Sequence, residues 1–253
     1  MGLEEARGFG VMSVNNEQRI LDFEEKPDEP RSLPDNPQCA LASMGIYVFN
    51  LDVLLAELHS DHDDSASSHD FGNDILPRLI KEKPVFAHPF GSQQGRVSQD
   101  RYWKDVGTLD AYYEANIALL DPVPSLNLYQ RDWPVRTYLP QSPPARTVPG
   151  EDGHDGVVYN SSLSGGTVIN GGTVMHSILS SWVRLEHASL VQDSILFNYV
   201  TVGAGAQLKR CIVDKHIHIP AGESIGYDLE RDRQRFTVTE QGVVVVGRRD
   251  RFD

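Results

Sequence analysis

The chain has 253 residues, too many for one small core and suited to one large or two modest domains. Its formal net charge of −13 argues against nucleic acid or an anionic membrane surface as the main partner, because both require a basic surface. Only two cysteines are present, so we expect no disulfide framework and no four-cysteine zinc site, and a reducing, cytoplasmic location. No apolar stretch has the length of a membrane span or a secretion signal, and we predict neither.

Strands are predicted at four places in the first part of the chain. Residues 9–26 have the pattern of a β-hairpin that ends at Pro27, since proline cannot donate a hydrogen bond to a neighbouring strand. The mostly apolar run 42–49 predicts a strand buried on both faces. Residues 85–90 predict another strand, and residues 102–103 predict the opening of one more.

Helices are predicted between these strands. Leucines at helical spacing predict a helix over 51–58, and an amphipathic turn follows at 75–80. Thr108 is the predicted N-cap of a helix over 109–120. Alternating strands and helices indicate an α/β layer, but the elements are too few for a complete domain. We therefore interpret residues 1–120 as the rear part of a larger α/β domain.

A proline-rich linker is predicted at 121–156, and a repeat follows over 157–253. Apolar residues recur in the repeat, and seven of the ten intervals between them are six residues long. They are Ile169, Met175, Leu179, Leu185, Leu190, Leu196, Val202, Leu208, Val213, Ile219 and Ile225. Six-residue rungs with glycines between them are typical of a parallel β-helix on a triangular cross-section, with each apolar residue inside the prism.

Four motifs precede this repeat in a fixed order: Glu25-Lys26-Pro27, Ser43 to Phe49, Ser67 to Gly72, and Tyr102 to Thr108. Together they make the chain closely resemble bacterial glucose-1-phosphate adenylyltransferases. The resemblance implies a Rossmann-like nucleotidyltransferase domain followed by a left-handed β-helix. It also implies transfer of the adenylyl group of ATP to glucose 1-phosphate, giving ADP-glucose and pyrophosphate for glycogen synthesis.

The sequence departs from the family pattern at its start. Members of the family begin with a Gly-rich nucleotide-binding segment, and this sequence does not contain one. We therefore expect the chain to hold the sugar-phosphate half of the active site and the regulatory β-helix. On that expectation ATP binds only together with the nucleotide-binding segment.

The resemblance assigns roles to individual residues. Lys26 matches the cation that binds the sugar phosphate and acts in catalysis, and Glu25 matches the residue that bonds sugar hydroxyls. Gly10 matches a glycine whose backbone meets the phosphate, and Ser43 matches a sugar-contacting serine. Further residues expected to line the sugar site are Tyr47, Asp70, Phe71 and Trp103.

Metal and effector contacts are implied in the same way. Asp105 resembles a catalytic carboxylate that binds Mg²⁺, and hard oxygen ligands suit that ion. Basic residues on positions expected to contact an anionic metabolite effector are Lys209, Arg210, Lys215 and Arg248. Family precedent predicts a homotetramer.

Two other interpretations are left open by the residues. A non-catalytic regulatory or assembly subunit, or an inactive fragment of the enzyme, would explain the missing Gly-rich loop. A hexapeptide-repeat acyltransferase would use the same prism, but it would leave the residues before the repeat without a role. Neither nucleic acid nor a membrane is an expected partner.

Overall fold

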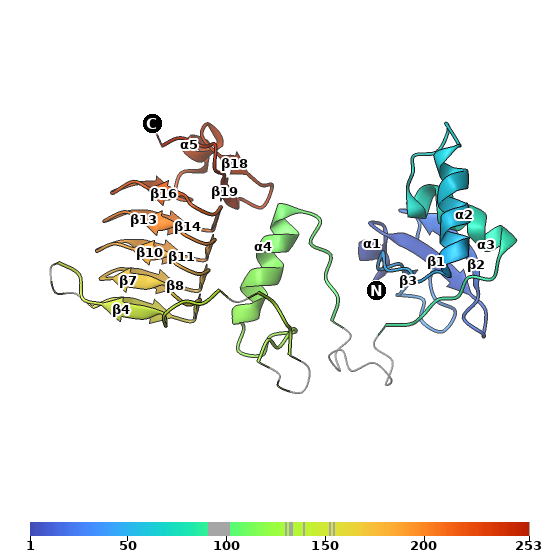
Figure 1. The fold of residues 1–253 in the computed structure, drawn as a ribbon, viewed down its shortest axis with the longest axis horizontal. Coiled ribbons are helices and arrows are strands. Elements are labelled where there is room, and N and C mark those ends of the chain that lie inside the picture. Colours follow the sequence, from blue (N-terminus) through green and yellow to red (C-terminus); the bar gives the residue numbers. More distant parts are fainter. Residues whose placement is uncertain are drawn as a thin grey trace. The chain divides into compact units, whose positions relative to one another are not determined.

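The computed structural model describes residues 1–90, 102–129, 131, 134–138, 140–151, 153 and 155–252. The chain divides into two compact units, Met1–Phe90 and Gly91–Asp253 (Figure 1). Each unit has apolar clusters of its own. Among the described residues, no helix is both long and apolar enough to cross a membrane.

The first unit is built on a small antiparallel sheet with the strand order β2-β1-β3. Its elements are α1 (Leu3–Ala6), β1 (Gly10–Val14), β2 (Ile20–Glu25), β3 (Leu41–Ala42), α2 (Leu51–His62), the π-helical turn η1 (Phe71–Ile75) and α3 (Leu76–Glu82). The predicted hairpin is confirmed, because β1 pairs with β2 from Gly10 opposite Glu25 to Val14 opposite Ile20. The predicted helices at 51–58 and 75–80 correspond to α2 and α3.

Two predicted strands of this unit are wrong in extent. Of the first, predicted over 42–49, only Ala42 lies in a strand, β3, and Gly45 turns the chain with a φ of +68°. The residues beyond are not buried, since Val48 is 98% exposed. The segment 85–90 forms only an isolated bridge between Phe86 and Arg19, and Pro89 there has no N–H to donate.

Helices α2 and α3 are held together by a buried carboxylate. The side chain of Glu57 is 6% exposed and forms ion pairs with Arg78 at 3.2 Å and Lys83 at 3.4 Å. Strand β2 contributes Ile20 and Phe23, which belong to one apolar cluster with Leu76 of α3. This packing fixes η1, which directly precedes α3, beside the end of β2.

The second unit contains a parallel β-helix of three sheets, as the repeat predicted (Figure 1). The first sheet has β4 (Arg146–Val148), β7 (Val168–Asn170), β10 (Arg184–Leu185), β13 (Thr201–Val202) and β16 (His218–Ile219). The second has β5 (Val157–Tyr159), β8 (Thr173–Met175), β11 (Leu190–Gln192), β14 (Gln207–Lys209) and β17 (Ser224–Ile225). The third has β6 (Ser162–Leu163), β9 (Ile178–Leu179), β12 (Ile195–Leu196), β15 (Cys211–Val213), β18 (Thr237–Val238) and β19 (Val244–Val246).

The register of the coils corrects two predicted core positions. Leu190 pairs with Gln207 and Gln207 with Ser224, so successive coils are offset by 17 residues rather than three full hexapeptides. Val174 and Val191 are completely buried, whereas Met175 is 36% exposed and Leu190 is only half-buried. The inward residue of β8 and of β11 is therefore the central valine, because neighbouring residues of a strand point to opposite faces.

Helix α4 (Leu109–Ile117) and the 3₁₀ turn η2 (Ala118–Leu120) belong to this second unit. Thr108 caps α4 as predicted, since its Oγ1 accepts the N–H of Ala111 at 3.1 Å. Tyr113 of α4 packs against Ile195, Ile212 and Val243 on the outside of the third sheet. Residues 102–103, the predicted start of a further strand, are not in a strand.

The limits of the compact units differ from the domain limits suggested by the sequence. The division lies after Phe90, whereas the sequence places α4 with the first domain. Strand β4 pairs with β7 although it lies inside the predicted linker 121–156. At the other end of the β-helix, α5 (Leu229–Arg233) and β18 follow the last coils (Figure 1).

Candidate functional site

The candidate site of the first unit lies where β2 ends. Glu25 is the last residue of β2, and Lys26 follows it with a φ of +48° and donates its backbone N–H to Phe9 at 3.1 Å. The Lys26 ammonium lies 3.8 Å from Glu25 Oε1 and its side chain is 66% exposed. An exposed cation beside a partly buried carboxylate suits recognition of a sugar phosphate, whose two ends have different chemistry.

The Glu25 carboxylate lies close to two glycines. A Cβ atom placed on Gly10 would lie 2.8 Å from Glu25 Oε2, and a Cβ atom on Gly72 would overlap the same oxygen. Burial raises the pKa of Glu25, the charge of Lys26 opposes this shift, and the charge of Asp70 adds to it. The site thus holds a carboxylate that is only partly solvated and has the backbone of two glycines close to it.

The candidate site also includes aromatic rings and two neighbouring hydroxyl groups. Ser43 Oγ and Tyr47 Oη are 3.0 Å apart, and the ring of Tyr47 stacks on Phe71 with a centroid distance of 5.7 Å. Phe49 completes this aromatic group, with its centroid 5.9 Å from that of Phe71. Phe49 was not among the residues predicted to line the sugar site, although it follows Tyr47 by two residues in the same mostly apolar run.

Asp70 is placed by the start of η1. Its Oδ1 accepts the N–H groups of Gly72 at 2.7 Å and Asn73 at 2.9 Å, which is the usual arrangement at a helix N-cap. The N–H of Asp70 itself donates to Asp74 Oδ2 at 3.1 Å. Asp70 therefore stands beside Gly72, and through it beside Glu25.

The structure brings most of the predicted sugar-site residues together. The members found in this cluster of the first unit are Gly10, Glu25, Lys26, Ser43, Tyr47, Asp70 and Phe71. Trp103 and Asp105 belong to the second unit. Their part in a sugar and metal site stays a prediction.

Asp105 lies in an exposed turn before α4. Its Oδ2 accepts the N–H of Gly107 at 3.2 Å, while Lys104 pairs with Glu114 of α4 at 3.8 Å. Within the described part of the chain, no group of three or more His, Cys, Asp or Glu side chains forms a ready metal cage. Asp105 offers one hard oxygen ligand, which is the share of ligands that a protein commonly gives to a magnesium ion bound to phosphates.

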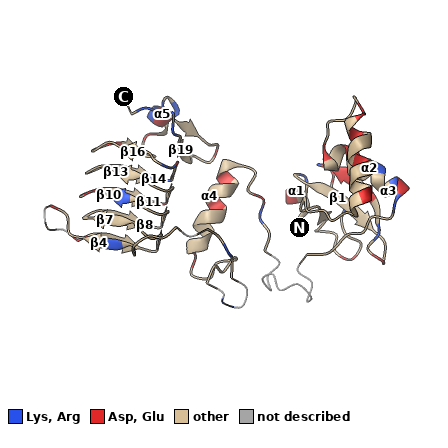
Figure 2. Cartoon of the chain, viewed as in Figure 1, with Lys and Arg blue, Asp and Glu red and all other residues tan. Residues whose placement is uncertain are grey.

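The residues predicted to contact an effector lie at two places on the β-helix: Lys215 is next to Arg248, and Lys209 is followed by Arg210. Arg248 Nε donates to the backbone oxygen of Lys215 at 3.3 Å and also pairs with Asp214 at 3.5 Å. Lys209 lies over the ring of Tyr227, and Arg210 lies over the ring of Tyr113 at 5.0 Å. Figure 2 shows further basic residues on β4, on β10 and at α5.

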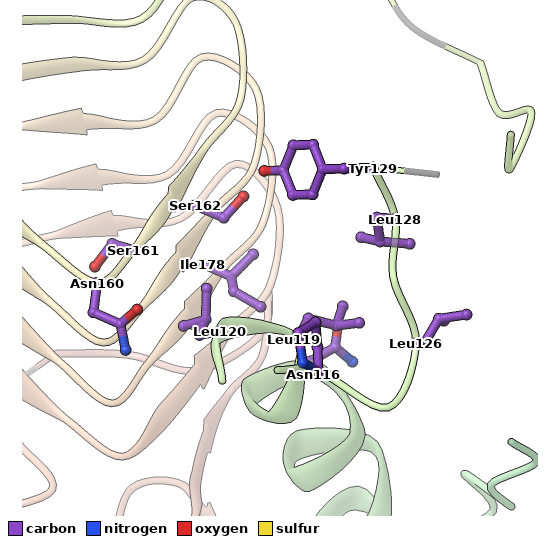
Figure 3. Close-up of a pocket in the computed structure, with 11 residues that line it drawn as sticks. Asn116, Leu119, Leu120, Leu126, Leu128, Tyr129, Asn160, Ser161, Ser162 and Ile178 are labelled. Carbon is purple, nitrogen blue, oxygen red and sulfur yellow. The ribbon is translucent and has the colours of Figure 1, made fainter. Parts of the chain in front are cut away.

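A separate pocket of about 280 Å³ lies between the end of α4 and the first coil of the β-helix (Figure 3). Four leucines contribute to its wall, and Asn116, Asn160, Ser161 and Ser162 provide polar groups. None of the residues predicted to bind sugar, metal or effector lines it. This pocket is therefore distinct from the site at the end of β2.

Comparison with known families matches both parts of the chain. Residues 1–121 match the nucleotidyl transferase family, and residues 143–246 match the GlmU-like C-terminal hexapeptide family. The second match begins within the segment predicted as a linker and agrees with the position of β4.

Individual relatives match the chain along nearly its whole length. Glucose-1-phosphate adenylyltransferase 2 of Vibrio cholerae is 51% identical over 96% of this chain and 60% of the relative. Glucose-1-phosphate adenylyltransferases of Methylobacillus flagellatus and Pectobacterium carotovorum are 50% and 44% identical, over 96% and 97% of this chain and 57% and 58% of the relatives. The chain spans about three-fifths of the length of these relatives. On these matches, the chain is similar to glucose-1-phosphate adenylyltransferases, with a part that matches nucleotidyl transferases followed by a hexapeptide β-helix.

Proposed function

We propose that the chain supplies the sugar-phosphate site of an enzyme that transfers the adenylyl group of ATP to glucose 1-phosphate. A phosphate oxygen of glucose 1-phosphate attacks the α-phosphorus of ATP, and the bond from that phosphorus to the β-phosphate bridge breaks. ADP-glucose and pyrophosphate are the products. The observation that carries the proposal is the gathering of Lys26, Glu25 and Asp70 around bare backbone in a chain similar to glucose-1-phosphate adenylyltransferases.

The residues of the first unit divide the recognition of the sugar phosphate between them. Lys26 is the exposed cation and would pair with the phosphate, while its neighbour Glu25 would accept hydrogen bonds from sugar hydroxyls. The stacked rings of Tyr47 and Phe71 offer an apolar wall for the pyranose ring. Transfer between phosphates needs positioning and charge neutralisation more than a protein nucleophile, and this set of residues provides both.

A magnesium ion is the cofactor we propose, with Asp105 as one ligand. The exposed carboxylate of Asp105 fits a metal that keeps most of its ligands from water and phosphate oxygens. When bound, such an ion neutralises charge on the phosphates. The role of Asp105 would be to orient the ion, and that of Lys26 to hold the sugar phosphate.

Regulation by an anionic metabolite is the second part of the proposal. Lys215 and Arg248 lie next to each other on the β-helix, and both side chains are exposed. Two neighbouring cations at a coil end favour a phosphate or carboxylate ligand. A homotetramer remains the expected assembly, and the two free cysteines agree with a reducing compartment such as the cytoplasm.

The regulatory-subunit alternative differs from this proposal in one measurable property. A subunit that only senses sugar phosphate would bind glucose 1-phosphate without restoring catalysis when its partner segment is added. The acyltransferase alternative loses its basis, because residues 1–121 match nucleotidyl transferases.

Titration calorimetry of the purified chain with glucose 1-phosphate tests the binding site. We expect Lys26→Ala to weaken binding about tenfold or more, since charge-assisted hydrogen bonds are worth about 1.5–3 kcal/mol. Lys81→Ala, which removes another exposed lysine of the first unit, is the matched control and should bind like the parent chain. A folded chain with no affinity for glucose 1-phosphate, or equal affinity in Lys26→Ala, would refute the site.

Complementation tests the reaction. The chain is mixed with the separately expressed nucleotide-binding part of the Vibrio cholerae relative, and ADP-glucose formation from ATP and glucose 1-phosphate is assayed. Activity that depends on both Lys26 and Asp105 supports the transferase. Binding without activity supports the regulatory subunit.

A further inference from the structure

The contact between Gly72 and Glu25 joins two segments that lie 47 positions apart in the sequence. The terminal carboxylate of Glu25 fills the space that a side chain at position 72 would need, and a Cβ atom there would also lie 2.8 Å from Glu25 Cδ. Gly10 borders the same carboxylate from β1. Two glycines from distant segments, Gly10 and Gly72, therefore border the Glu25 carboxylate with bare backbone.

The Gly72 side of this contact is firmly held. The N–H of Gly72 donates to Asp70 Oδ1 at 2.7 Å, and the N–H of Asp70 donates to Asp74 Oδ2 at 3.1 Å. Ser68 Oγ donates to the same oxygen of Asp74 at 2.5 Å. A backbone tied by several hydrogen bonds resists displacement, so position 72 is the fixed partner of the pair.

The loop before Asp70 has a second anchor. The side chain of Asp61 is 6% exposed at the end of α2, and its carboxylate accepts from Ser67 Oγ at 2.6 Å. His69 Nδ1 lies 2.8 Å from the other oxygen of Asp61, and His69 has a φ of +59°. These contacts hold both ends of the turn that directly precedes Gly72.

Glu25 is the movable partner. Its contact atoms are at the end of a flexible side chain that can rotate toward Lys26 and solvent. Gly10 differs in this respect, because a Cβ atom there would also meet the buried ring of Phe23. A methyl group at position 72 thus displaces a carboxylate, whereas one at position 10 disturbs the core.

We propose that Gly72 is a positioning residue, which holds the Glu25 carboxylate where it can accept hydrogen bonds from the hydroxyls of a hexose phosphate. This inference rests on the proposed function of the first unit and adds the residue that sets its hydroxyl-binding geometry. Gly72 itself contributes no side-chain contact to the ligand. Its effect on binding passes mainly through Glu25, and a Cβ atom there would also lie 3.2 Å from Asp70 Oδ1.

The first experiment measures binding of glucose 1-phosphate by the whole chain. We expect Gly72→Ala to lower the affinity about tenfold or more with no decrease in the unfolding midpoint, since one hydrogen bond to a charged group accounts for that factor. Gly8→Ala is the control, because a Cβ atom there would meet only Glu5 O, at an ordinary 3.6 Å. Equal affinity of Gly72→Ala and the parent chain overturns the inference.

The second experiment is a double-mutant cycle with Glu25→Asp. The shorter aspartate withdraws the carboxylate from position 72, so Gly72→Ala should add little further loss to Glu25→Asp. Fully additive losses mean that the two residues act independently, which contradicts the inference. Where Gly72→Ala alone does not fold, folding regained in the double variant supports the carboxylate contact, and continued failure to fold refutes it.

The third experiment separates this inference from the proposed function. The side-chain carbonyl carbon of Glu25 is followed by NMR as a function of pH in the chain without ligand. Displacement into solvent should bring the pKa of Glu25 in Gly72→Ala closer to its ordinary value, with no change in Gly8→Ala. A shifted titration in a chain that never binds glucose 1-phosphate keeps the positioning role and rejects the function. An unshifted titration rejects the positioning role.

Discussion

Tyr113 of α4 donates a hydrogen bond from its hydroxyl to the backbone oxygen of Asp193, 80 residues further along the chain, at 2.6 Å. The ring is 3% exposed, and the guanidinium of Arg210 lies 5.0 Å from its centroid. Burial raises the pKa of Tyr113 to about 12. This residue therefore ties α4 to the β-helix through a hydrogen bond, a cation–π contact and apolar packing.

Removing the hydroxyl should weaken this attachment. We expect Tyr113→Phe to lower the free energy of unfolding of the second unit by about 1 kcal/mol, the usual value of a hydrogen bond. Tyr113→Ala should cost about 3–5 kcal/mol, because it also leaves a cavity. All three tryptophans follow residue 90, so urea unfolding followed by tryptophan fluorescence reports on this unit.

Tyr129→Phe is the control for this change, since Tyr129 is 86% exposed. Its unfolding free energy should equal that of the parent chain. Equal stability of Tyr113→Phe and Tyr129→Phe would show that the hydroxyl of Tyr113 contributes nothing.

The partner of α4 could not be predicted from the sequence. Thr108 and the apolar spacing correctly predicted the start and length of the helix, because both signals are local. The apolar face of a helix indicates that something covers it but does not identify what does. Position in the sequence groups α4 with the α/β part, and in the structure its Tyr113 packs on Ile195 of β12.

The other predictions succeeded where the signal in the sequence is local and failed where the structure depends on distant residues. The hairpin was predictable because its turn, its alternation and Pro27 lie within one short segment. The strand over 42–49 was overpredicted, since apolar composition does not reveal that Gly45 turns the chain. In the candidate site, the motifs predicted Glu25 and its neighbours, and their roles stay predictions. Gly72 was missed because its importance depends on what lies opposite it.

The register of the β-helix can be tested at neighbouring residues. Val174 is completely buried inside the prism, and Met175 is 36% exposed on the outside. We expect Val174→Asp to destabilise the second unit by roughly 4 kcal/mol or more, because it buries an unpaired charge. Met175→Asp should change the stability by less than about 1 kcal/mol. If urea unfolding showed a larger loss of stability for Met175→Asp than for Val174→Asp, the register expected from strict hexapeptides would be correct instead.

Substitutions at two glycines with left-handed backbone conformations can measure the cost of backbone strain and the cost of steric overlap separately. Gly226 has a φ of +84°, and a Cβ atom there would overlap the backbone oxygen of Lys209. Gly205 has a φ of +68° and open space around it. Gly205→Ala should cost about 1–2 kcal/mol from the backbone conformation alone. Gly226→Ala should cost clearly more, and comparable losses in thermal unfolding would argue against the close approach of Lys209.

Glu25 is expected to reduce the stability of the first unit while serving its site. Burial raises its pKa above the ordinary value of 4.5, so the folded unit disfavours the ionised form relative to the unfolded chain. Below that ordinary value both states carry the proton and no penalty arises. As the pH rises through the higher folded pKa, the penalty develops in full. We therefore expect Glu25→Gln to stabilise the unit at pH 7 but not at pH 4, and to weaken binding of glucose 1-phosphate at pH 7.

Calorimetric unfolding at the two pH values, combined with ligand titration at pH 7, measures both effects of this substitution. Glu24→Gln is the matched control, because Glu24 is the exposed neighbour on the same strand and should show neither effect. A stabilised Glu25→Gln chain with lower affinity would mean that the carboxylate is kept at this position for binding at a cost in stability, as is common for functional residues. A destabilised Glu25→Gln chain at pH 7 would instead mean that the carboxylate stabilises the end of β2 through Lys26.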